Sequence, residues 1–259
     1  FGRILAERMG YSLKCDGLPE FPNTQTGVTG ASYDVPEERL ISGFFFIDHL
    51  VSNSEKRKIF VDGHFQNYRY FKAYRDQIRQ WFEYPAGAHD VSNATVVHVR
   101  RGDYVTIGWA LPFSYYKDAI AKVWDGTSPL FIATDDREDP FFKNFAQYEP
   151  QFIDAPPVDT IMTMSRAKNM VMSRSSFSWW AAFLGQHEKV VCPKPNEGFW
   201  SEAERDLQSV DLIDEQEFVC VPCDGVYTPD AAEKRYFFLQ KLRKKLRIPR
   251  RSTPSDFHR

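Results

Sequence analysis

The sequence predicts an α/β protein with parallel strands. Strand and helix patterns alternate along the chain between residues 94 and 192, which is typical of βαβ units with helices on both faces of a parallel sheet. Hydrophobic residues make up 42% of the 259 residues, enough for a sizeable core. No run of about 18 apolar residues is present, so no segment is expected to span a membrane.

The first part of the chain predicts a smaller domain at residues 1–92. Residues 1–15 predict the end of a helix followed by a short strand at Tyr11–Cys15, and residues 16–36 predict a loop. A further strand is expected at Lys58–Val61. Apolar and aromatic residues then recur at helical spacing over Tyr68–Phe82. Pro85-Ala86-Gly87 interrupts this pattern close to the expected domain boundary.

The second part of the chain predicts the parallel sheet, in a domain at residues 93–225. Each expected strand is a short apolar run, and a segment of helical character separates it from the next strand. The expected strands are 94–99, 129–134, 151–153, 169–172 and 189–192, and the expected helices are 112–124, 138–148, 158–168 and 177–184. Ligands of such sheets bind beyond the carboxyl ends of the strands. Residues 226–259 are expected to form a basic tail.

Three of these strands end in polar residues suited to a nucleotide. The first strand runs into His98-Val99-Arg100-Arg101-Gly102-Asp103. Arginine forks grip phosphate oxygens and keep their charge, so two arginines at a strand end suit a diphosphate. Successive strand side chains point to opposite faces, so an alternative is that one arginine reaches phosphate and the other braces the strand end. Two further alternatives are a salt-bridged end, with Asp103 holding Arg101, and an adhesive Arg-Gly-Asp tripeptide.

The second polar strand end is Asp135-Asp136, which follows the strand at 129–134. A carboxylate at this position can accept hydrogen bonds from ribose hydroxyls, or from N1–H and the exocyclic amine of guanine. The alternative is a helix N-cap ahead of Pro140.

The third polar strand end is Ser173-Arg174-Ser175-Ser176-Phe177-Ser178, between the strand at 169–172 and an apolar helix. Serine hydroxyls, free backbone N–H groups and the positive end of the helix dipole all favour an anion at such a helix start. The alternative is simple N-capping by Ser175 or Ser176. Trp179 and Trp180 are expected in the core.

The motifs that the sequence lacks also narrow its function. No Asp-x-Asp occurs, which argues against a transferase that holds its diphosphate through a metal. The phosphate-binding loop of kinases and the commonest hydrolase signatures are absent too. Cys220-Val-Pro-Cys223 lacks the second ligand pair that a zinc site requires. No metal or other cofactor is therefore expected.

Taken together, these segments resemble the GT11 family of α-1,2-fucosyltransferases. Residues 97–105 are similar to its HxRRGDY motif, and residues 173–182 to its S-N-S-[ST]-F-S-W-W-[AG]-A block, with Arg174 in place of Asn. Residues 62–71 resemble its G-Y-[FW]-Q-S-x-K-Y-F segment, with His64 in place of Tyr, and residues 1–11 resemble its first helix. The resemblance ends near residue 200. The family's Gly-rich G-G-L-G-N-Q loop is not in the sequence, and the segment after Asp103 is short for the family.

The resemblance implies a GT-B architecture, with two facing Rossmann-like domains, here followed by a C-terminal basic helix. It also implies an inverting, metal-independent transfer of L-fucose from GDP-β-L-fucose to the 2-OH of a galactoside. The expected donor-binding residues are Arg100, Arg101, His98, Asp135, Asp136, Ser175, Ser176, Phe177 and Ser178. The catalytic candidates are Asp103, Arg101 and His98, and the acceptor-side candidates are His64, Gln66 and Tyr104. The alternatives are another linkage, such as α-1,6, and a catalytically inactive nucleotide-sugar-binding protein.

The basic tail suggests a further partner. Residues 233–251 contain many Lys and Arg residues with aromatic and aliphatic residues between them, and a single acid, Glu233. This pattern is typical of a basic amphipathic helix that lies on anionic lipid, although a solvated helix packed back on the body is an alternative. A nucleic-acid-binding helix would have a similar pattern, but nothing else in the sequence supports such a partner, so none is expected. The expected location is the cytoplasm or the cytoplasmic membrane surface for a bacterial protein, and the Golgi lumen for a truncated eukaryotic enzyme.

Overall fold

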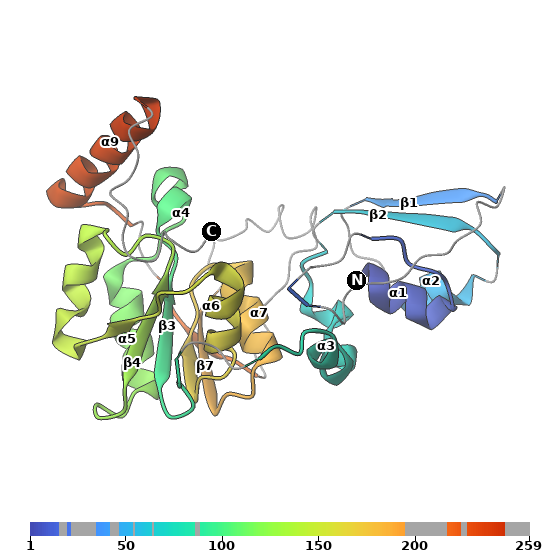
Figure 1. The fold of residues 1–259 in the computed structure, drawn as a ribbon, viewed down its shortest axis with the longest axis horizontal. Helices are drawn as coiled ribbons and strands as arrows, with labels where there is room; N and C mark the ends of the chain where they lie inside the picture. Colours follow the sequence, from blue (N-terminus) through green and yellow to red (C-terminus); the bar gives the residue numbers. More distant parts are fainter. Residues whose placement is uncertain are drawn as a thin grey trace. The chain divides into compact units, whose positions relative to one another are not determined.

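The structure is a computed structural model that describes residues 1–15, 20–21, 35–41, 47–53, 55–63, 65–85, 89–194, 217–223 and 227–246. The described residues fall into two compact units, Phe1–Pro85 and the residues from 89 onward (Figure 1). Within these ranges, no helix is long and apolar enough to cross a membrane. The GT-B arrangement and the domain boundaries stay predictions.

The first unit contains two paired strands and several short helices. The strands β1 (Glu37–Ile41) and β2 (Lys58–Asp62) are parallel, with Glu37 opposite Lys58. The helices are α1 (Gly2–Met9), α2 (Ile47–Ser52) and α3 (Arg75–Trp81), and the 3-10 turns are η2 (Tyr68–Tyr70) and η3 (Lys72–Tyr74). The single helix expected over Tyr68–Phe82 is therefore divided, because the Asn67 side chain accepts the Arg69 N–H and starts a 3-10 turn.

The strand expected at Tyr11–Cys15 is wrong, because these residues have no regular secondary structure. Gly10 ends α1 in the left-handed conformation, with φ at 66°. This turn directs the Tyr11 N–H to the Ala6 carbonyl oxygen at 2.8 Å, so the chain closes the helix end instead of starting a ladder.

A six-stranded parallel sheet forms the centre of the second unit. Its strands are β3 (Thr95–Val99), β4 (Leu130–Thr134), β5 (Gln151–Phe152), β6 (Asn169–Val171), β7 (Lys189–Pro193) and β8 (Val219–Val221). They lie in the order β5-β4-β3-β6-β7-β8, which is the order of a Rossmann sheet. The predicted parallel α/β sheet is confirmed, and β8 is an edge strand that the sequence did not reveal.

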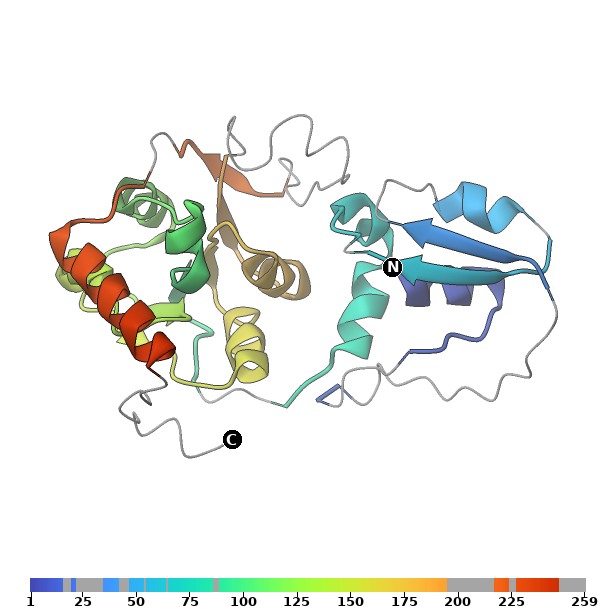
Figure 2. The same cartoon turned by 90° about the horizontal axis from the view of Figure 1, so that it is seen from above.

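Helices cover both faces of this sheet (Figure 2). The helix α5 (Phe113–Val123) and the 3-10 helix η4 (Pro140–Tyr148) lie on one face, and α6 (Pro157–Met164) and α7 (Ser176–Leu184) pack together on the other. Side chains of β3 alternate between these faces, so Val97 and Val99 join Ile120 of α5 in one core, while His98 faces α7. As expected, Trp179 is buried in the core.

Two elements of this unit differ from the sequence expectations. A short helix, α4 (Gly102–Ile107), follows β3 directly, where no helix was expected. The helix expected at 138–148 is the 3-10 helix η4, in which the Asn144 side chain donates to the Phe141 carbonyl oxygen and competes with the backbone ladder. Beyond β8, the basic helix α9 (Ala231–Lys245) packs against η4.

Candidate active site

The three polar strand ends lie side by side at the carboxyl edge of the six-stranded sheet. In the sheet, β3 pairs with β4 on one side and with β6 on the other, so the ends that carry Arg100, Asp135 and Ser173 are neighbours. The sheet reverses its winding direction between β3 and β6, because β4 and β5 extend it one way and β7 and β8 the other. Open α/β sheets bind their ligands beyond the strand ends at such a switch point.

A hydrogen bond crosses the switch point and joins two of the predicted motifs. The Ser173 hydroxyl lies 2.8 Å from His98 Nδ1, and the Phe177 ring lies 5.5 Å from the imidazole centroid. Burial, together with the smaller effect of the neighbouring Arg100 charge, lowers the pKa of His98 to about 3. The imidazole is therefore neutral at physiological pH. A neutral, buried ring suits a role in shaping the site better than a role in proton transfer.

Arg100 is the accessible arginine of the pair. Its side chain is 33% exposed and forms ion pairs with Asp103 at 2.7 Å and Asp135 at 3.2 Å. The guanidinium carbon also lies 5.2 Å from the centroid of the Tyr104 ring. Asp103 stands in the first turn of α4 with its side chain 62% exposed. We refer to Arg100, Asp103 and Asp135 as the outer cluster.

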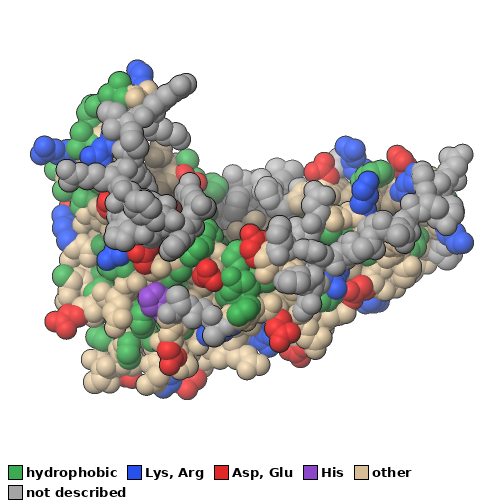
Figure 3. All heavy atoms as spheres, in the orientation of Figure 1, with side chains coloured by type: hydrophobic (Ala, Val, Ile, Leu, Met, Phe, Trp, Pro, Cys, Tyr) green, Lys and Arg blue, Asp and Glu red, His purple; other side chains and the backbone are tan. Residues whose placement is uncertain are grey.

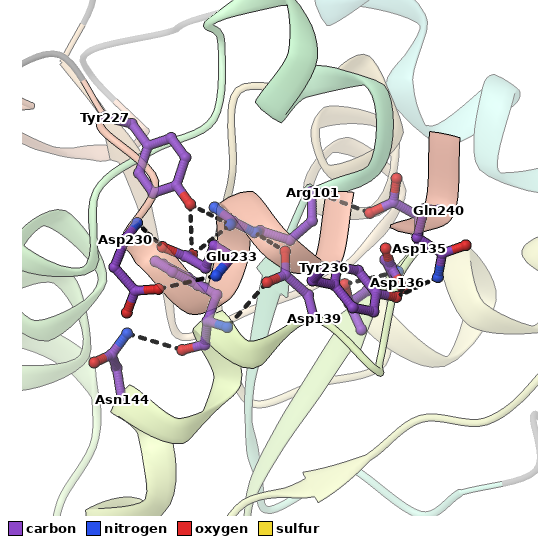
Figure 4. A network of polar contacts seen from close by, with 12 residues as sticks. Arg101, Asp135, Asp136, Asp139, Asn144, Tyr227, Asp230, Glu233, Tyr236 and Gln240 are labelled. Atoms are coloured by element: carbon purple, nitrogen blue, oxygen red, sulfur yellow. Dashed lines mark hydrogen bonds and ion pairs between the residues drawn. The ribbon is translucent and has the colours of Figure 1, made fainter. Parts of the chain in front are cut away.

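Arg101 lies in a different environment, with a side chain that is 0% exposed. Its Nε donates to Asp139 at 2.6 Å and its Nη2 to Glu233 of α9 at 2.8 Å (Figure 4). The guanidinium carbon lies 4.5 Å from the centroid of the Tyr227 ring, whose hydroxyl also binds Glu233. We refer to Arg101, Asp139, Tyr227 and Glu233 as the buried cluster.

The buried cluster favours bracing as the main role of Arg101. Burial alone lowers its pKa, but hydrogen bonds to Asp139 and Tyr227 raise it above the ordinary value, so the guanidinium stays charged. Its Nη1 is buried and has no hydrogen-bond partner within the described ranges. This nitrogen is the part of the side chain that remains for the predicted donor contact. The alternative in which Asp103 holds Arg101 is wrong, because Asp103 pairs with Arg100.

Asp135 is fixed against the backbone that follows β3. Its Oδ1 accepts the Arg101 N–H at 2.8 Å. A Cβ atom on Gly102 would lie 2.3 Å from its Oδ2, so only glycine leaves room for this carboxylate. Asp136 is buried and accepts a hydrogen bond from Tyr236 of α9 at 2.7 Å. Neither aspartate caps η4, because the N-cap is Asp139, which accepts the Phe141 N–H.

The serine segment is divided between capping and the switch point. Ser175 is the N-cap of α7 and accepts the Phe177 N–H at 3.2 Å. Ser178 is buried, and its hydroxyl donates to the carbonyl oxygens of Ser173 and Ser175. Ser175, Ser176 and Phe177 are half-buried at the start of α7. The N-capping alternative for Ser175 is therefore confirmed, and this helix start still lies beside the end of β3.

The two acceptor-side candidates that the structure describes belong to different units. Tyr104 belongs to the second unit, where it lies beside Arg100 and packs edge-to-face on Trp109. Gln66 belongs to the first unit and is half-buried. His64 lies outside the described residues. Among the residues that are described, no group of three or more His, Cys, Asp or Glu side chains could hold a metal. The metal independence of the site stays a prediction.

Several residues of the site were not found from the sequence. Asp139, Tyr227, Glu233 and Tyr236 bind the predicted motif residues from outside the motifs. One sequence signal was available, because Asp230 and Glu233 have the spacing of a capping box that starts a helix. The spacing does not predict that the start of this helix would bind Arg101.

Comparison with known proteins identifies the class to which this architecture belongs. The sequence model of glycosyl transferase family 11 matches residues 46–214, more than half of the chain. The chain is therefore a member of glycosyl transferase family 11, in agreement with the resemblance seen in its motifs.

Two curated relatives, both from Escherichia coli, are similar to this chain. An α-1,2-colitosyltransferase is 31% identical over 190 residues, which cover 64% of this chain and 64% of the relative. The O-antigen biosynthesis glycosyltransferase WbnK is 29% identical over 123 residues, which cover 42% of this chain and 40% of the relative. The matches thus span less than two thirds of each relative. No solved structure matches the chain significantly.

Proposed function

We propose that this glycosyltransferase moves L-fucose from GDP-β-L-fucose to the 2-OH of a galactoside, without a metal and with inversion at the anomeric carbon. The observation that supports this proposal is the convergence of three motif-bearing strand ends at the switch point of a Rossmann sheet. A nucleotide placed there lies beside Arg100, the start of α7 and the Asp135 carboxylate. The proposal includes the GT-B arrangement, with domains at residues 1–92 and 93–225 and a tail at 226–259.

In the proposed reaction, the acceptor oxygen attacks the anomeric carbon while the bond to the GDP β-phosphate oxygen breaks. Negative charge then builds on the β-phosphate and must be stabilised. Arg100 is our candidate for this role, because its guanidinium is accessible and charged. The first turn of α7 adds backbone N–H groups and the positive end of its dipole. Asp135 is proposed to read the nucleoside, with Asp136 held behind it.

The acceptor hydroxyl loses its proton in this step, and Asp103 is our candidate for the group that receives it. Its carboxylate is exposed and lies 2.7 Å from Arg100, so the base and the phosphate-binding group would be adjacent. When the donor diphosphate takes over Arg100, Asp103 is released to the acceptor. His64 is the alternative base. His98 and Phe177 are proposed to line the nucleotide pocket.

The name of one relative supports a second donor sugar. Because an α-1,2-colitosyltransferase is 31% identical to this chain, we propose colitose as the alternative to fucose at the same site. The two further alternatives are another linkage, such as α-1,6, and a nucleotide-sugar-binding protein without activity. All of them keep the nucleotide at the same strand ends.

The decisive experiment incubates the protein with GDP-linked fucose or colitose, a panel of β-galactosides and EDTA, followed by linkage analysis of the product. We expect an α-1,2-linked product that EDTA does not abolish. Stabilisation against heat by GDP, compared with ADP and UDP, is measured on the same sample. GDP binding without any product supports the inactive binding protein. A protein that neither binds GDP nor forms product contradicts the proposal.

We propose in addition that α9 rests on an anionic membrane, which would place a bacterial enzyme at the cytoplasmic membrane surface. The helix is polar towards the body, where Glu233, Tyr236 and Gln240 form hydrogen bonds. Its exposed apolar residues are Phe238, Leu239 and Leu242, and the exposed Leu246 directly follows it. Figure 3 shows hydrophobic and basic side chains next to each other along this helix. The exposed basic residues are Lys234, Arg235, Lys241, Arg243 and Lys245.

This orientation suits lipid, because the outward face combines an apolar stripe with basic flanks and exposes no acid of the helix. Phe238→Glu should weaken binding to phosphatidylglycerol vesicles about ten-fold, since it removes one apolar side chain that the lipid would bury and adds a negative charge. Phe60→Glu, at an exposed phenylalanine of β2, is the matched control. Equal binding of the two variants, or equal binding to neutral vesicles, would remove the membrane from the proposal.

A further inference from the structure

The helix α9 closes over the same strand ends that form the proposed donor site. Glu233 at its start binds Arg101, which follows β3, and Tyr236 one turn later binds Asp136, which follows β4 (Figure 4). The first contact joins residues 132 positions apart in the chain, and the second joins residues 100 positions apart. A single helix therefore holds two of the three strand ends.

Glu233 uses its two carboxylate oxygens for different purposes. Oε2 accepts the Asp230 N–H at 2.7 Å, and the Glu233 N–H donates back to Asp230 Oδ1 at 2.9 Å, which completes a capping box. Oε1 accepts Arg101 Nη2 at 2.8 Å and the Tyr227 hydroxyl. The side chain is almost fully buried, so these bonds are shielded from water. The start of α9 and the position of Arg101 are thus fixed by one group.

The position of Arg101 determines the position of the outer cluster. Its backbone N–H holds Asp135 Oδ1 at 2.8 Å, and Asp135 Oδ2 in turn lies 3.2 Å from Arg100 Nη1. Arg100 also precedes Arg101 directly in the chain. A displacement of Arg101 would therefore move both the proposed phosphate-binding arginine and the proposed nucleoside-binding carboxylate.

We infer that Glu233 and Tyr236 are positioning residues of the donor site, so that α9 is part of the catalytic apparatus although it contains none of the family motifs. Glu233 acts through Arg101 on Arg100, and Tyr236 acts through Asp136 on the neighbouring Asp135. The inference rests on the proposed function, because it requires a nucleotide-sugar donor at these strand ends. It assigns a different kinetic effect to each residue.

The test compares two conservative variants in the full chain, without vesicles. Glu233→Gln keeps the shape of the side chain but replaces one acceptor oxygen with a donor group. Because Arg100 would shift against the leaving phosphate, kcat should fall about 100-fold, and the accompanying shift of Asp135 should raise the KM for the donor about five-fold. Tyr236→Phe removes one hydroxyl. It should raise the donor KM about five-fold with little change in kcat, since Asp135 then holds the nucleoside less firmly.

Two matched controls carry the same chemical changes elsewhere in the second unit. Glu188→Gln alters an exposed ion pair with Lys168, and Tyr148→Phe alters a ring that packs on Trp124. Both should keep the wild-type kcat and KM. The melting temperature and GDP titration of every variant give the folded fraction, to which kcat is scaled.

The outcomes separate this inference from the proposed function. Wild-type protein without GDP binding and without product refutes the proposed function itself. An active wild type, together with variants whose kcat and KM per folded molecule equal those of the controls, overturns the positioning role. If Glu233→Gln does not fold, the donor KM of Tyr236→Phe decides alone. A five-fold rise supports the inference, and an unchanged KM contradicts it.

Discussion

Arg100 and Arg101 are adjacent in the sequence, but the clusters that they join differ in almost every physical respect. In the buried cluster, two carboxylates and the Tyr227 ring surround the Arg101 side chain, which is 0% exposed, and the Phe141 ring lies against the same guanidinium. The outer cluster holds Arg100 between two carboxylates that water also reaches. The difference shows how a strand end divides neighbouring residues between stability and chemistry, because successive side chains point in opposite directions. The predictions below test this division.

The largest expected effect belongs to the buried cluster. Arg101→Ala removes the cation and leaves the Asp139 and Glu233 carboxylates facing each other without it. Breaking a buried ion pair in this way costs about 3 to 5 kcal/mol of unfolding free energy. Urea unfolding followed by circular dichroism measures the loss. Arg137→Ala, at an exposed ion pair with Asp154, should cost less than about 1 kcal/mol.

The outer cluster should respond in activity and not in stability. Arg100→Ala is expected to lower kcat about 100-fold or more, equivalent to about 3 kcal/mol, because charge on the leaving phosphate is no longer neutralised. Its unfolding free energy should change by less than about 1 kcal/mol, since Arg100 is partly exposed. Steady-state kinetics and urea unfolding on the same preparation test both statements. Near-normal turnover of Arg100→Ala would show that the division of roles is mistaken.

The buried imidazole of His98 should make the unfolding free energy of the protein depend on pH. Its pKa is about 3 in the folded protein against an ordinary value of 6.5, so the unfolded chain binds more protons between these pH values. The associated stability is complete above about pH 6.5 and is lost as the pH falls towards 3. Between pH 7 and pH 4.5, wild-type protein should lose about 2 kcal/mol more unfolding free energy than His98→Gln. Parallel curves for the two proteins would contradict the buried, neutral imidazole.

The smallest effect expected in this comparison of the two clusters concerns Gly102, which lies between them in the chain. Gly102→Ala places a Cβ 2.3 Å from Asp135 Oδ2 and should displace that carboxylate, lowering GDP affinity about ten-fold. Calorimetric titration with GDP measures this change. Gly108→Ala is the control, because Gly108 also has a positive φ, of 77°, but has no atom within 4 Å of the added Cβ. Similar affinities of the two variants would mean that Asp135 does not contact the nucleotide.

The sheet of the second unit was predictable, because its strands are apolar runs that carry their own signal. The strands at 94–99 and 129–134 differ from β3 and β4 by no more than one residue. The short helix α4 could not be predicted, because Arg101-Gly102-Asp103 has no helical periodicity. The strand β8 has three residues, of which Val219 is exposed and Val221 is buried, and its place in the sheet depends on pairing with β7. In the first unit, the strand predicted at Tyr11–Cys15 is wrong, because a strand-like sequence forms a strand only where a neighbouring strand is available to pair with it.

The candidate site was predictable as a set of strand ends but not as a set of contacts. The motifs that contain Arg100, Asp135 and Ser173 follow adjacent strands, and strand order places them together. The partner of Arg101 could not be found in the same way, because Glu233 comes from a helix far along the chain. Sequence spacing reveals local partners such as Asp230 and Glu233, whereas a long-range ion pair depends on tertiary packing.

The separation of Arg101 from Glu233 has a consequence for the order in which the protein is built. The two residues are 132 positions apart, so during synthesis the arginine emerges long before its second carboxylate. Asp139, which is 38 positions away, can reach it earlier. Tyr227, which also surrounds Arg101, is made late as well, so the buried cluster can be completed only after residue 233 has been added. Non-local contacts of this kind slow folding, and chains that still lack them expose surface on which aggregation can begin.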